Sequence, residues 1–531
     1  MQPSIQPTTS PPPWRPNEYK TEPVQMREMP NESLNAGSAQ KADHFHRRAA
    51  FALIIIGTLL HLAYSTHLEL VGDEAYYWLW SRHPDISYLD KGPMVAWFIS
   101  AGTAFFGQTV FGVRFFAVLL AGGTGVGLYS LGAALFSARA GFWAVLMASV
   151  IPLFAVGASL MTIDTVYVFF WTWAAWAFWK ANHEPGLRWW LLTGCLVGLG
   201  ILSKYTAAME LVSFALFCCW HRPARVHFRR PDFWAMIGVA LLFLLPAAIW
   251  NIRHGWPTSH WLVTRGGLEH RFTLHPLSVV EFFGSQAGVV SPLLFVGLLF
   301  LLSRRSLLQT DRPATRYTLT LFLPLFSFYF VLSANYHEPP NWTAAAYIGG
   351  LILLAAKWPL LMATSRKARW LAAVAVVLAM LETGLLLGGH WLHLPARLDP
   401  LNRARGSQAL AQALAKVQQK TGASFIIAED YMTASLLSFY LPGQPETFVP
   451  IVFPPMDQLE VWPNYEEEHP TGNALFMSKR NKVSESFHAR FAQITSLGEI
   501  EVKDYGRVIR RYKIYLCRRG IIDPAQEQPA Q

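Results

Sequence analysis

Long apolar runs, separated by short polar segments, dominate the chain from Ala49 to Gly389. Several runs reach the roughly 20 residues that a helix needs to cross a bilayer. A further segment at residues 93–106 has an amphipathic or re-entrant character, and Pro93 suits the first turn of its helix. The pattern predicts a mainly α, polytopic membrane protein with eleven spans, at residues 49–67, 109–136, 140–158, 162–180, 188–203, 205–221, 232–251, 282–303, 316–334, 342–362 and 369–389.

The two ends of the chain differ from this apolar middle. Residues 1–48 are rich in proline and poor in aliphatic side chains, which is typical of a disordered tail, and no apolar core follows the N-terminus as in a signal peptide. Beyond a transmembrane domain at 49–395, residues 396–531 are much more polar. There Ser407–Thr421 has helical periodicity and ends at Gly422, Ser424–Ala428 suits a strand, and Val502–Leu516 suggests paired strands. A small α/β domain is therefore expected.

Composition and charge agree with a membrane protein. Of 531 residues, 52% are hydrophobic and only 15% are charged, whereas soluble domains carry about a quarter charged residues. The net charge of +10 lies largely in short loops, so it is no sign of nucleic-acid binding. With a cytoplasmic N-terminus, the loops predicted to be inside hold more Lys and Arg than those outside, as the positive-inside rule requires. The odd number of spans then places the first loop and the C-terminal domain outside the cytoplasm.

Charged residues from three distant segments meet on that outer side. The first loop supplies Asp73, Glu74, Asp90 and Lys91, together with Tyr77. The fourth predicted span begins near Asp164, and Lys204 lies between the fifth and sixth. Placing ionisable groups at a membrane boundary costs free energy unless they face water or a partner. Such groups therefore indicate a functional site. Such a set could hold an anionic lipid headgroup and activate a hydroxyl.

Each of these residues also has a purely structural interpretation. Asp73 and Glu74 could stabilise a helix N-terminus, and Asp164 could cap one. Lys91 could extend its ammonium to the interface, and Lys204 could pair with Glu210 or with phospholipid headgroups. The tyrosines of the first loop could form an aromatic belt. Only the ordered combination on one face favours function. The four cysteines show no CxxC spacing, which supports neither a metal cluster nor a disulfide framework.

The order of several short motifs adds a family resemblance. The chain resembles bacterial glycosyltransferases of family 39, the group that includes protein O-mannosyltransferases and lipid A aminoarabinose transferases. The resemblance covers about Ala49 to Pro450. Its motifs are Gly72-Asp-Glu-Ala-Tyr-Tyr-Trp, Tyr88-Leu-Asp-Lys-Gly-Pro-Met, Phe106-Gly, Val113-Arg114, Asp164, Gly200-Ile-Leu-Ser-Lys-Tyr-Thr-Ala, Trp250-Asn251 with Gly255-Trp256, Pro340-Asn-Trp-Thr, and Tyr431 with Ser438-Phe-Tyr-Leu-Pro-Gly.

The resemblance implies a type-C glycosyltransferase (GT-C) fold and a polyprenyl-phosphate-linked sugar donor used on the outer face of the membrane. It implies that Asp73 is the principal catalytic carboxylate, completed by Glu74, and that Asp164 is a second acidic residue of the site. It further implies that Lys91, beside Asp90, contacts the carrier phosphate. The chain departs from the aminoarabinose branch at Tyr76, where that branch has arginine, and at Gly92, where it has proline. Both departures put lipid A as acceptor in doubt.

The chemistry of these groups suggests a mechanism. Lys91, with Lys204 or Arg265, would neutralise the departing phosphate, while Tyr77 belongs to the substrate-binding set. Asp73 would take the proton of an acceptor hydroxyl, and direct attack would invert the anomeric carbon. Adjacent carboxylates can hold a divalent cation, but the resemblance implies a metal-independent enzyme, so no metal ligand is assigned.

The partners expected are a polyprenyl-phosphate-linked sugar, membrane lipids and an acceptor that is a lipid, a glycan or a protein. A flippase or transporter of polyprenyl-linked sugars and a glycolipid-binding scaffold are the alternatives. The loop from Trp256 to His275 is either a lid or a solvated loop.

Overall fold

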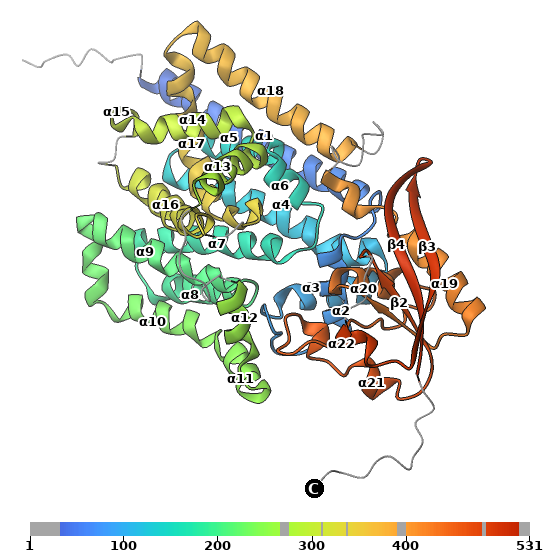
Figure 1. The fold of residues 1–531 in the computed structure, drawn as a ribbon. Helices are drawn as coiled ribbons and strands as arrows, with labels where there is room; N and C mark the ends of the chain where they lie inside the picture. Colours follow the sequence, from blue (N-terminus) through green and yellow to red (C-terminus); the bar gives the residue numbers. More distant parts are fainter. Residues whose placement is uncertain are drawn as a thin grey trace, which may run out of the picture.

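A computed structural model describes residues 32–265, 275–308, 312–335, 338–389, 400–480 and 485–519. They form a body of packed helices and a smaller α/β domain at one end of it (Figure 1). The helices of the body are α1 (Glu32–Tyr64), α2 (Gly72–Arg82), α3 (Met94–Phe106), α4 (Val110–Leu135), α5 (Ala138–Val150), α6 (Pro152–Gly157), α7 (Ile163–His183), α8 (Leu187–Ile201), η1 (Tyr205–Ala208), α9 (Met209–Trp220), η2 (Arg222–Arg229), α10 (Pro231–Leu242), α11 (Leu245–His254), α12 (Pro257–Arg265), α13 (Pro276–Val290), α14 (Pro292–Ser303), α15 (Arg305–Leu308), α16 (Pro313–Ser333), η3 (Pro340–Thr343), α17 (Ala346–Ala363) and α18 (Arg366–Gly388).

Each of the eleven predicted spans coincides with helical structure in the described part of the chain. Six helices are long and apolar enough to cross a membrane, or seven if the bent pair α13–α14 counts as one span. Shorter apolar helices, such as α8 and α5, have 10–17 residues, fewer than a bilayer requires. The polytopic, mainly α prediction is therefore confirmed, whereas the number of eleven spans stays a prediction.

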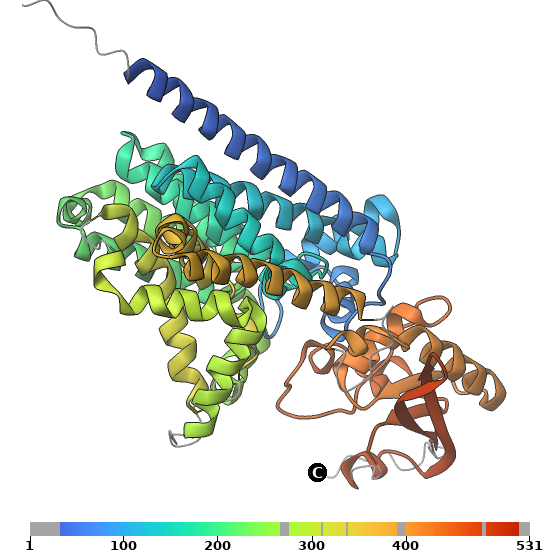
Figure 2. The same ribbon diagram turned by 90° about the horizontal axis from the view of Figure 1, so that it is seen from above.

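Helical structure begins before the predicted boundary between tail and first span. Helix α1 begins at Glu32, well before the expected start of the span at Ala49. After Pro30 the sequence has no proline until Pro84, and the stretch before Ala49 contains several alanines, so nothing stops the helix from extending in this direction. Figure 2 shows α1 as a long helix along one side of the bundle. Residues 1–31 of the expected tail lie outside the described residues.

The C-terminal domain combines a mixed sheet with short helices. Its elements are η4 (Pro400–Ala404), α19 (Ser407–Thr421), β1 (Phe425–Ala428), α20 (Tyr431–Tyr440), η5 (Gln458–Glu460), α21 (Tyr465–Glu468), β2 (Ala474–Ser478), α22 (Glu485–His488), β3 (Gln493–Asp504) and β4 (Arg507–Arg518). The strand order is β1-β2-β4-β3, in which only β1 and β2 are parallel. The expected helix, first strand and strand pair are confirmed, and Gly422 ends α19 in the left-handed conformation.

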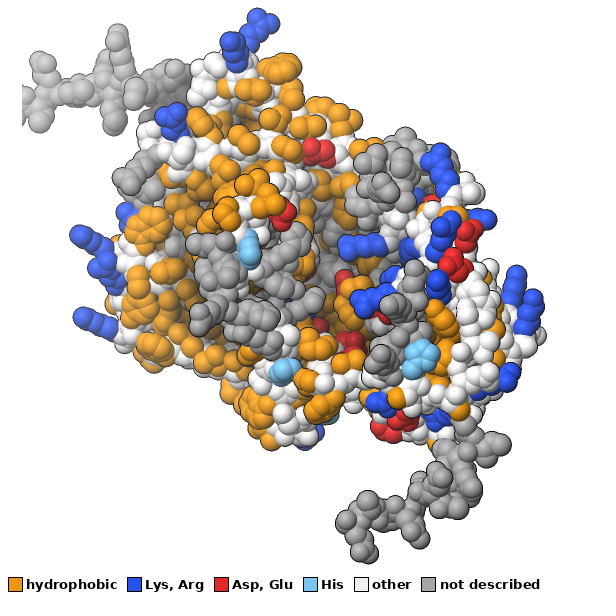
Figure 3. All heavy atoms as spheres, viewed as in Figure 1, with side chains coloured by type: hydrophobic (Ala, Val, Ile, Leu, Met, Phe, Trp, Pro, Cys, Tyr) orange, Lys and Arg blue, Asp and Glu red, His pale blue; other side chains and the backbone are white. Residues whose placement is uncertain are grey.

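The C-terminal domain is packed firmly onto the first loop of the body. One apolar core joins Trp78 and Trp80 of α2 to Leu437 of α20 and Ile426 of β1. Hydrophobic side chains cover much of the helical body, whereas charged ones gather over the C-terminal domain (Figure 3). Helix α2 therefore lies between the membrane part and the C-terminal domain, which is where the candidate residues begin.

Candidate active site

Glu74 belongs to a buried ion pair that fixes the start of α2. Its carboxylate accepts hydrogen bonds from Arg114 Nε and Nη2, at 2.8 and 2.6 Å. It also accepts the backbone N–H groups of Val71 and Met161, at 3.1 and 2.9 Å. Arg114 in turn donates to the carbonyls of Ser65, Leu68 and Glu69. Both side chains are enclosed and their polar atoms are partnered, so this pair holds the first loop in shape.

Asp73, the neighbouring residue, lines the largest described cavity of the molecule. Consecutive helical residues point about 100° apart, so α2 directs the two carboxylates to different surroundings. Burial raises the pKa of Asp73, and nearby Asp90 and Asp164 raise it further, while Arg403 and Lys91 lower it. A carboxylate with a raised pKa is a stronger base than an exposed aspartate.

Asp90 and Lys91 follow on the turn before α3, and both line the same cavity. The Lys91 ammonium donates to the Asp90 carbonyl at 3.0 Å and lies 3.6 Å from Asp90 Oδ2. It also lies 4.1 Å from the ring centroid of Trp261 on α12. Asp90 Oδ1 is buried without a hydrogen-bond partner in the described part of the chain. A cation and an available acceptor therefore face one space.

Gly92 shows why this turn departs from the aminoarabinose branch. A Cβ at this position would lie 2.1 Å from the Leu202 carbonyl oxygen and 2.5 Å from its carbon. The same carbonyl accepts the N–H of Met94 at 3.2 Å. The backbone of Leu202 lies so close to Gly92 that it leaves no room for proline or for any other side chain. The turn that carries Lys91 is thus packed directly against the end of α8.

Asp164 and Lys204 form an ion pair from two separate helices. Asp164, in the first turn of α7, accepts a hydrogen bond from Lys204 Nζ at 2.8 Å and from Asn341 Nδ2 at 2.6 Å. The ammonium also lies 5.2 Å from the ring centroid of Trp342. Lys204 therefore pairs with Asp164 and not with Glu210, and the backbone of Thr162, not Asp164, occupies the cap position of α7.

The tyrosines of α2 are buried. Tyr77 lines the cavity, and Tyr76 accepts the backbone N–H of Gln458 at 2.6 Å through its hydroxyl. The rings of Tyr76 and Tyr431 lie 4.5 Å apart between centroids. The structure therefore uses Tyr76 to attach the C-terminal domain, a role for which an arginine would be unsuited.

The cavity that unites these residues measures about 1430 Å³. Its polar end is lined by Asp73, Asp90, Lys91 and Asp164, whereas Glu74 and Lys204 lie behind the wall. Its apolar part runs between α1, α4, α5, α6 and α18, where the lining includes Leu53, Leu60, Val118, Leu153, Met380 and Leu387. The side chain of Arg265 lies outside the described residues, as does the loop at 266–274.

Four further lining residues did not emerge from sequence reasoning. Asn341 lies in the motif Pro340-Asn-Trp-Thr, which drew attention for its pattern alone. Arg403, Tyr431 and Asp457 come from the C-terminal domain. Tyr431 belongs to a motif of the family resemblance, but nothing in the local sequence of Arg403 or Asp457 differs from an ordinary surface. Only the docking of this domain brings the three residues to the cavity. Within the described residues, no group of three or more His, Cys, Asp or Glu side chains could hold a metal ion.

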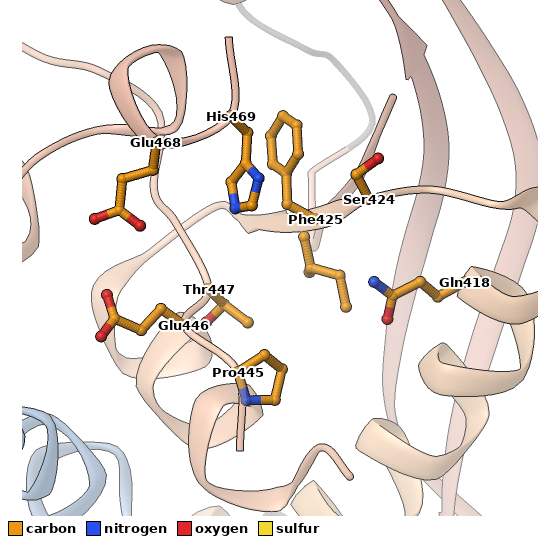
Figure 4. Close-up of a pocket in the computed structure, with 9 residues that line it drawn as sticks. Gln418, Ser424, Phe425, Pro445, Glu446, Thr447, Glu468 and His469 are labelled. Carbon is orange, nitrogen blue, oxygen red and sulfur yellow. The ribbon is translucent and has the colours of Figure 1, made fainter. Parts of the chain in front are cut away.

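A second, smaller hollow of about 290 Å³ lies in the C-terminal domain (Figure 4). Glu446 and Glu468 lie on one side of it and Gln418 on the other, with the stacked rings of Phe425 and His469 between them. Glu446 pairs with His83 at 2.7 Å. None of the residues predicted for the site lines this hollow, whereas Asp73, Tyr77, Asp90, Lys91 and Asp164 line the larger cavity.

Three comparisons with known proteins agree with this geometry. Residues 90–250 match the family model of the dolichyl-phosphate-mannose-protein mannosyltransferases, a segment that includes Asp90, Lys91, Asp164 and Lys204. Lipid A galacturonosyltransferase RgtD of Rhizobium johnstonii is 25% identical over 370 residues, covering 67% of this chain and 75% of RgtD. Over these segments the chain is similar to family 39-like glycosyltransferases.

Solved structures show the corresponding fold. The crystal structure of ArnT from Cupriavidus metallidurans in the apo state matches this chain with a TM-score of 0.59 and 15% identity, covering 87% of this chain and 97% of ArnT. The same protein bound to undecaprenyl phosphate matches with a TM-score of 0.59, 16% identity and the same coverage. The GT-C fold expected from the sequence is confirmed.

Proposed function

We propose that this chain transfers a sugar from a polyprenyl phosphate to an acceptor on the extracytoplasmic side of a bacterial inner membrane. The observation that carries the proposal is the cavity in which Asp73, Asp90, Lys91 and Asp164 border a long apolar groove. An apolar groove continuous with a charged end fits a ligand with a prenyl chain and a phosphate. The structure of ArnT with bound undecaprenyl phosphate, which has the same fold, supports the same donor class.

In the proposed reaction the bond between the anomeric carbon and the phosphate oxygen breaks, and its electron pair stays on the phosphate. Lys91 and Arg403 neutralise this charge at the moment at which it develops. An acceptor oxygen bonds to the opposite face of the anomeric carbon, and its proton passes to Asp73. Direct displacement inverts the configuration. If the acceptor group is itself a phosphate, Asp73 orients it and no strong base is required.

The remaining candidates receive supporting roles in this mechanism. Asp164 is held by Lys204 and Asn341, so its carboxylate presents a fixed, partly neutralised acceptor beside Asp73. Glu74 positions Asp73 through the ion pair with Arg114 rather than by contact with substrate. Tyr77 forms a buried wall of the polar end. Arg265 stays in the proposal as a further phosphate contact on the grounds of its charge alone.

The proposed orientation in the membrane follows from two features that lie at opposite ends of the molecule. The arginine-rich η2 segment lies at the end of the helical body near α9 and α10, and the C-terminal domain lies at the opposite end (Figure 1). With positive loops in the cytoplasm, the cavity opens on the outer side. Charges gathered at one end also argue against a flippase, whose substrate site is expected near the membrane midplane.

The function is tested by mass spectrometry of envelope lipids, glycans and proteins from cells that lack the chain and are complemented with wild type, Asp73→Asn or Asp43→Asn. Glycolipids are the first acceptors to examine, because RgtD is named for lipid A. A mass of one sugar should be lost without the chain and return with wild type. Asp43 lies exposed on α1, so its variant serves as the matched control and should restore the sugar as well.

Asp73→Asn should fail to restore the missing sugar although the protein accumulates normally. Full restoration by this variant would instead favour transport or scaffolding, and it would remove the catalytic role from Asp73.

A further inference from the structure

A short segment of the C-terminal domain, Met456–Glu460, borders the large cavity through Met456 and Asp457. Gln458 is only 1% exposed and links this segment to the first loop in two ways. Its backbone N–H donates to the Tyr76 hydroxyl at 2.6 Å, and its side-chain Oε1 accepts the N–H of Leu89 at 2.7 Å. Leu89 directly precedes Asp90. The position of Asp457 is therefore fixed relative to Asp90 and Lys91.

Asp457 faces the cavity from this segment. It is 9% exposed and lines the same space as Asp90. Its Oδ1 accepts the N–H groups of Leu459 and Glu460, at 2.9 and 3.3 Å, so the cap of η5 uses Oδ1 and not Oδ2. Burial, with the charge of Glu460 and a smaller contribution from Asp90, raises the pKa of Asp457 to about 8. This shift favours the protonated carboxyl, which can both donate and accept hydrogen bonds.

Charge divides the polar end into two parts. Lys91 and Arg403 are the Lys and Arg side chains among the described lining residues, and both suit a phosphate. The carboxyl groups in that lining belong to Asp73, Asp90, Asp164 and Asp457. Asp164 is paired with Lys204, and the raised pKa of Asp457 favours its protonated form, so a phosphate on the two cations leaves the carboxylates of Asp73 and Asp90 around whatever is attached to it. Such surroundings favour hydroxyl or ammonium groups and oppose another carboxylate.

We propose that Asp457 and Asp90 form the donor-sugar subsite, and that this subsite selects a sugar that presents hydroxyl or ammonium groups and has no carboxylate. The proposal rests on the proposed function, because it names the substrate class of that same site. The buried, unpartnered Oδ1 of Asp90 supplies the acceptor on one side, and the Asp457 carboxyl supplies a donor and an acceptor on the other. The C-terminal domain thus acts as a determinant of donor specificity.

The test measures binding of four probes to the purified full-length protein in lipid nanodiscs. The probes are undecaprenyl phosphate alone and undecaprenyl phosphate carrying glucose, 4-amino-4-deoxyarabinose or galacturonate. The wild type should bind the glucose- or aminoarabinose-linked donor about tenfold more tightly than the galacturonate-linked one, as expected for one hydrogen bond to a charged group gained or lost. The glucose and aminoarabinose arms show whether hydroxyl or ammonium groups are preferred.

Two variants of Asp457 separate sugar binding from the helix cap. Asp457→Ser keeps a capping oxygen for η5 but is too short to reach a sugar, whereas Asp457→Asn keeps both the cap and a neutral hydrogen-bonding group. The serine variant should weaken binding of the preferred glycosylated donor about tenfold and leave undecaprenyl phosphate alone unchanged. The asparagine variant should bind the glycosylated donor almost as tightly as the wild type does.

The possible failures are distinguishable. If the wild type does not bind undecaprenyl phosphate at all, the proposed function is wrong. If it binds this lipid but prefers the galacturonate-linked donor, only the sugar subsite is wrong. Equal losses for bare and glycosylated lipid in Asp457→Ser also overturn the subsite, because they indicate a role in wall structure. The comparison of donors on the wild type decides the matter even if the serine variant does not fold.

Discussion

At the scale of single residues, two adjacent carboxylates have opposite surroundings. Asp73 faces a cavity, while Glu74 is enclosed by Arg114 and backbone N–H groups. The sequence identified the pair but could not divide the roles, because the partner of Glu74 lies forty positions away on another helix. A local pattern shows which residues are charged, but it does not show which of them the fold will neutralise.

Glu74→Gln is expected to destabilise the protein rather than to stop the chemistry alone. It leaves the Arg114 guanidinium buried and without a counter-charge, which costs about 3–5 kcal/mol in comparable pairs. Thermal unfolding in detergent should show a clear drop for Glu74→Gln and little change for Asp73→Asn. A stable Glu74→Gln enzyme with the same loss of turnover as Asp73→Asn would instead place Glu74 in the reaction.

The raised pKa of Asp73 predicts a pH dependence. The base must be ionised, so kcat/KM should fall as the pH falls through its pKa. Because burial raises that pKa, the decline should begin above the value of about 4 that is typical of an aspartate. The folded-state pKa also exceeds the unfolded-state pKa, so ionisation of Asp73 reduces stability as the pH rises, and Asp73→Asn should not lower the stability at neutral pH. Activity that stays constant down to pH 4 would contradict this assignment.

At the scale of elements, close backbone contacts hold the catalytic turns. Helix α19 and the β3–β4 pair were predictable, because periodicity and a terminal glycine mark them locally. The bend of 114° between α13 and α14 and the early start of α1 were not predictable from hydropathy. Hydropathy reports which residues avoid water, but it does not report where a helix bends or how far it extends into the polar region.

Gly92→Ala should disturb the turn that carries Lys91. Its Cβ would meet the backbone at Leu202, which cannot yield without moving the end of α8 and the adjacent Lys204. Binding of undecaprenyl phosphate should weaken by about tenfold or more, corresponding to a loss of roughly 1.4 kcal/mol. Gly238→Ala is the matched control, since a Cβ there meets nothing within 4 Å, and it should bind like the wild type. Equal binding of undecaprenyl phosphate by both variants would show that the turn is not essential for binding this lipid.

At the scale of the whole molecule, the C-terminal domain completes the site. Glu69 of the body accepts N–H groups at the start of α19, and the Tyr440 hydroxyl of α20 accepts the N–H of Leu70. Polarity of the tail predicted a separate domain, but no local signal predicted that Arg403, Tyr431 and Asp457 would line the cavity. Long-range docking of this kind is determined by complementary surfaces, which one sequence does not reveal.

Gln458→Ala should loosen this docking without removing any group that contacts substrate. It deletes the acceptor for the Leu89 N–H, leaving a buried donor unsatisfied at a cost of about 1–3 kcal/mol. Hydrogen exchange at Leu89 and its neighbours should accelerate, and kcat/KM should fall by about tenfold. Gln408→Ala, whose side chain is exposed, should change neither quantity. Unchanged exchange in Gln458→Ala would show that the segment is not a structural link.

The central claim is that one cavity holds a polyprenyl phosphate, with its phosphate at Lys91 beside Asp73. An experimental structure of the full-length protein in nanodiscs with undecaprenyl phosphate tests this claim most directly. The account predicts the prenyl chain in the groove between α1, α6 and α18, and the phosphate within hydrogen-bonding distance of Lys91 Nζ. A lipid bound only on the outer surface of the bundle, with no phosphate near Lys91 or Asp73, would contradict it.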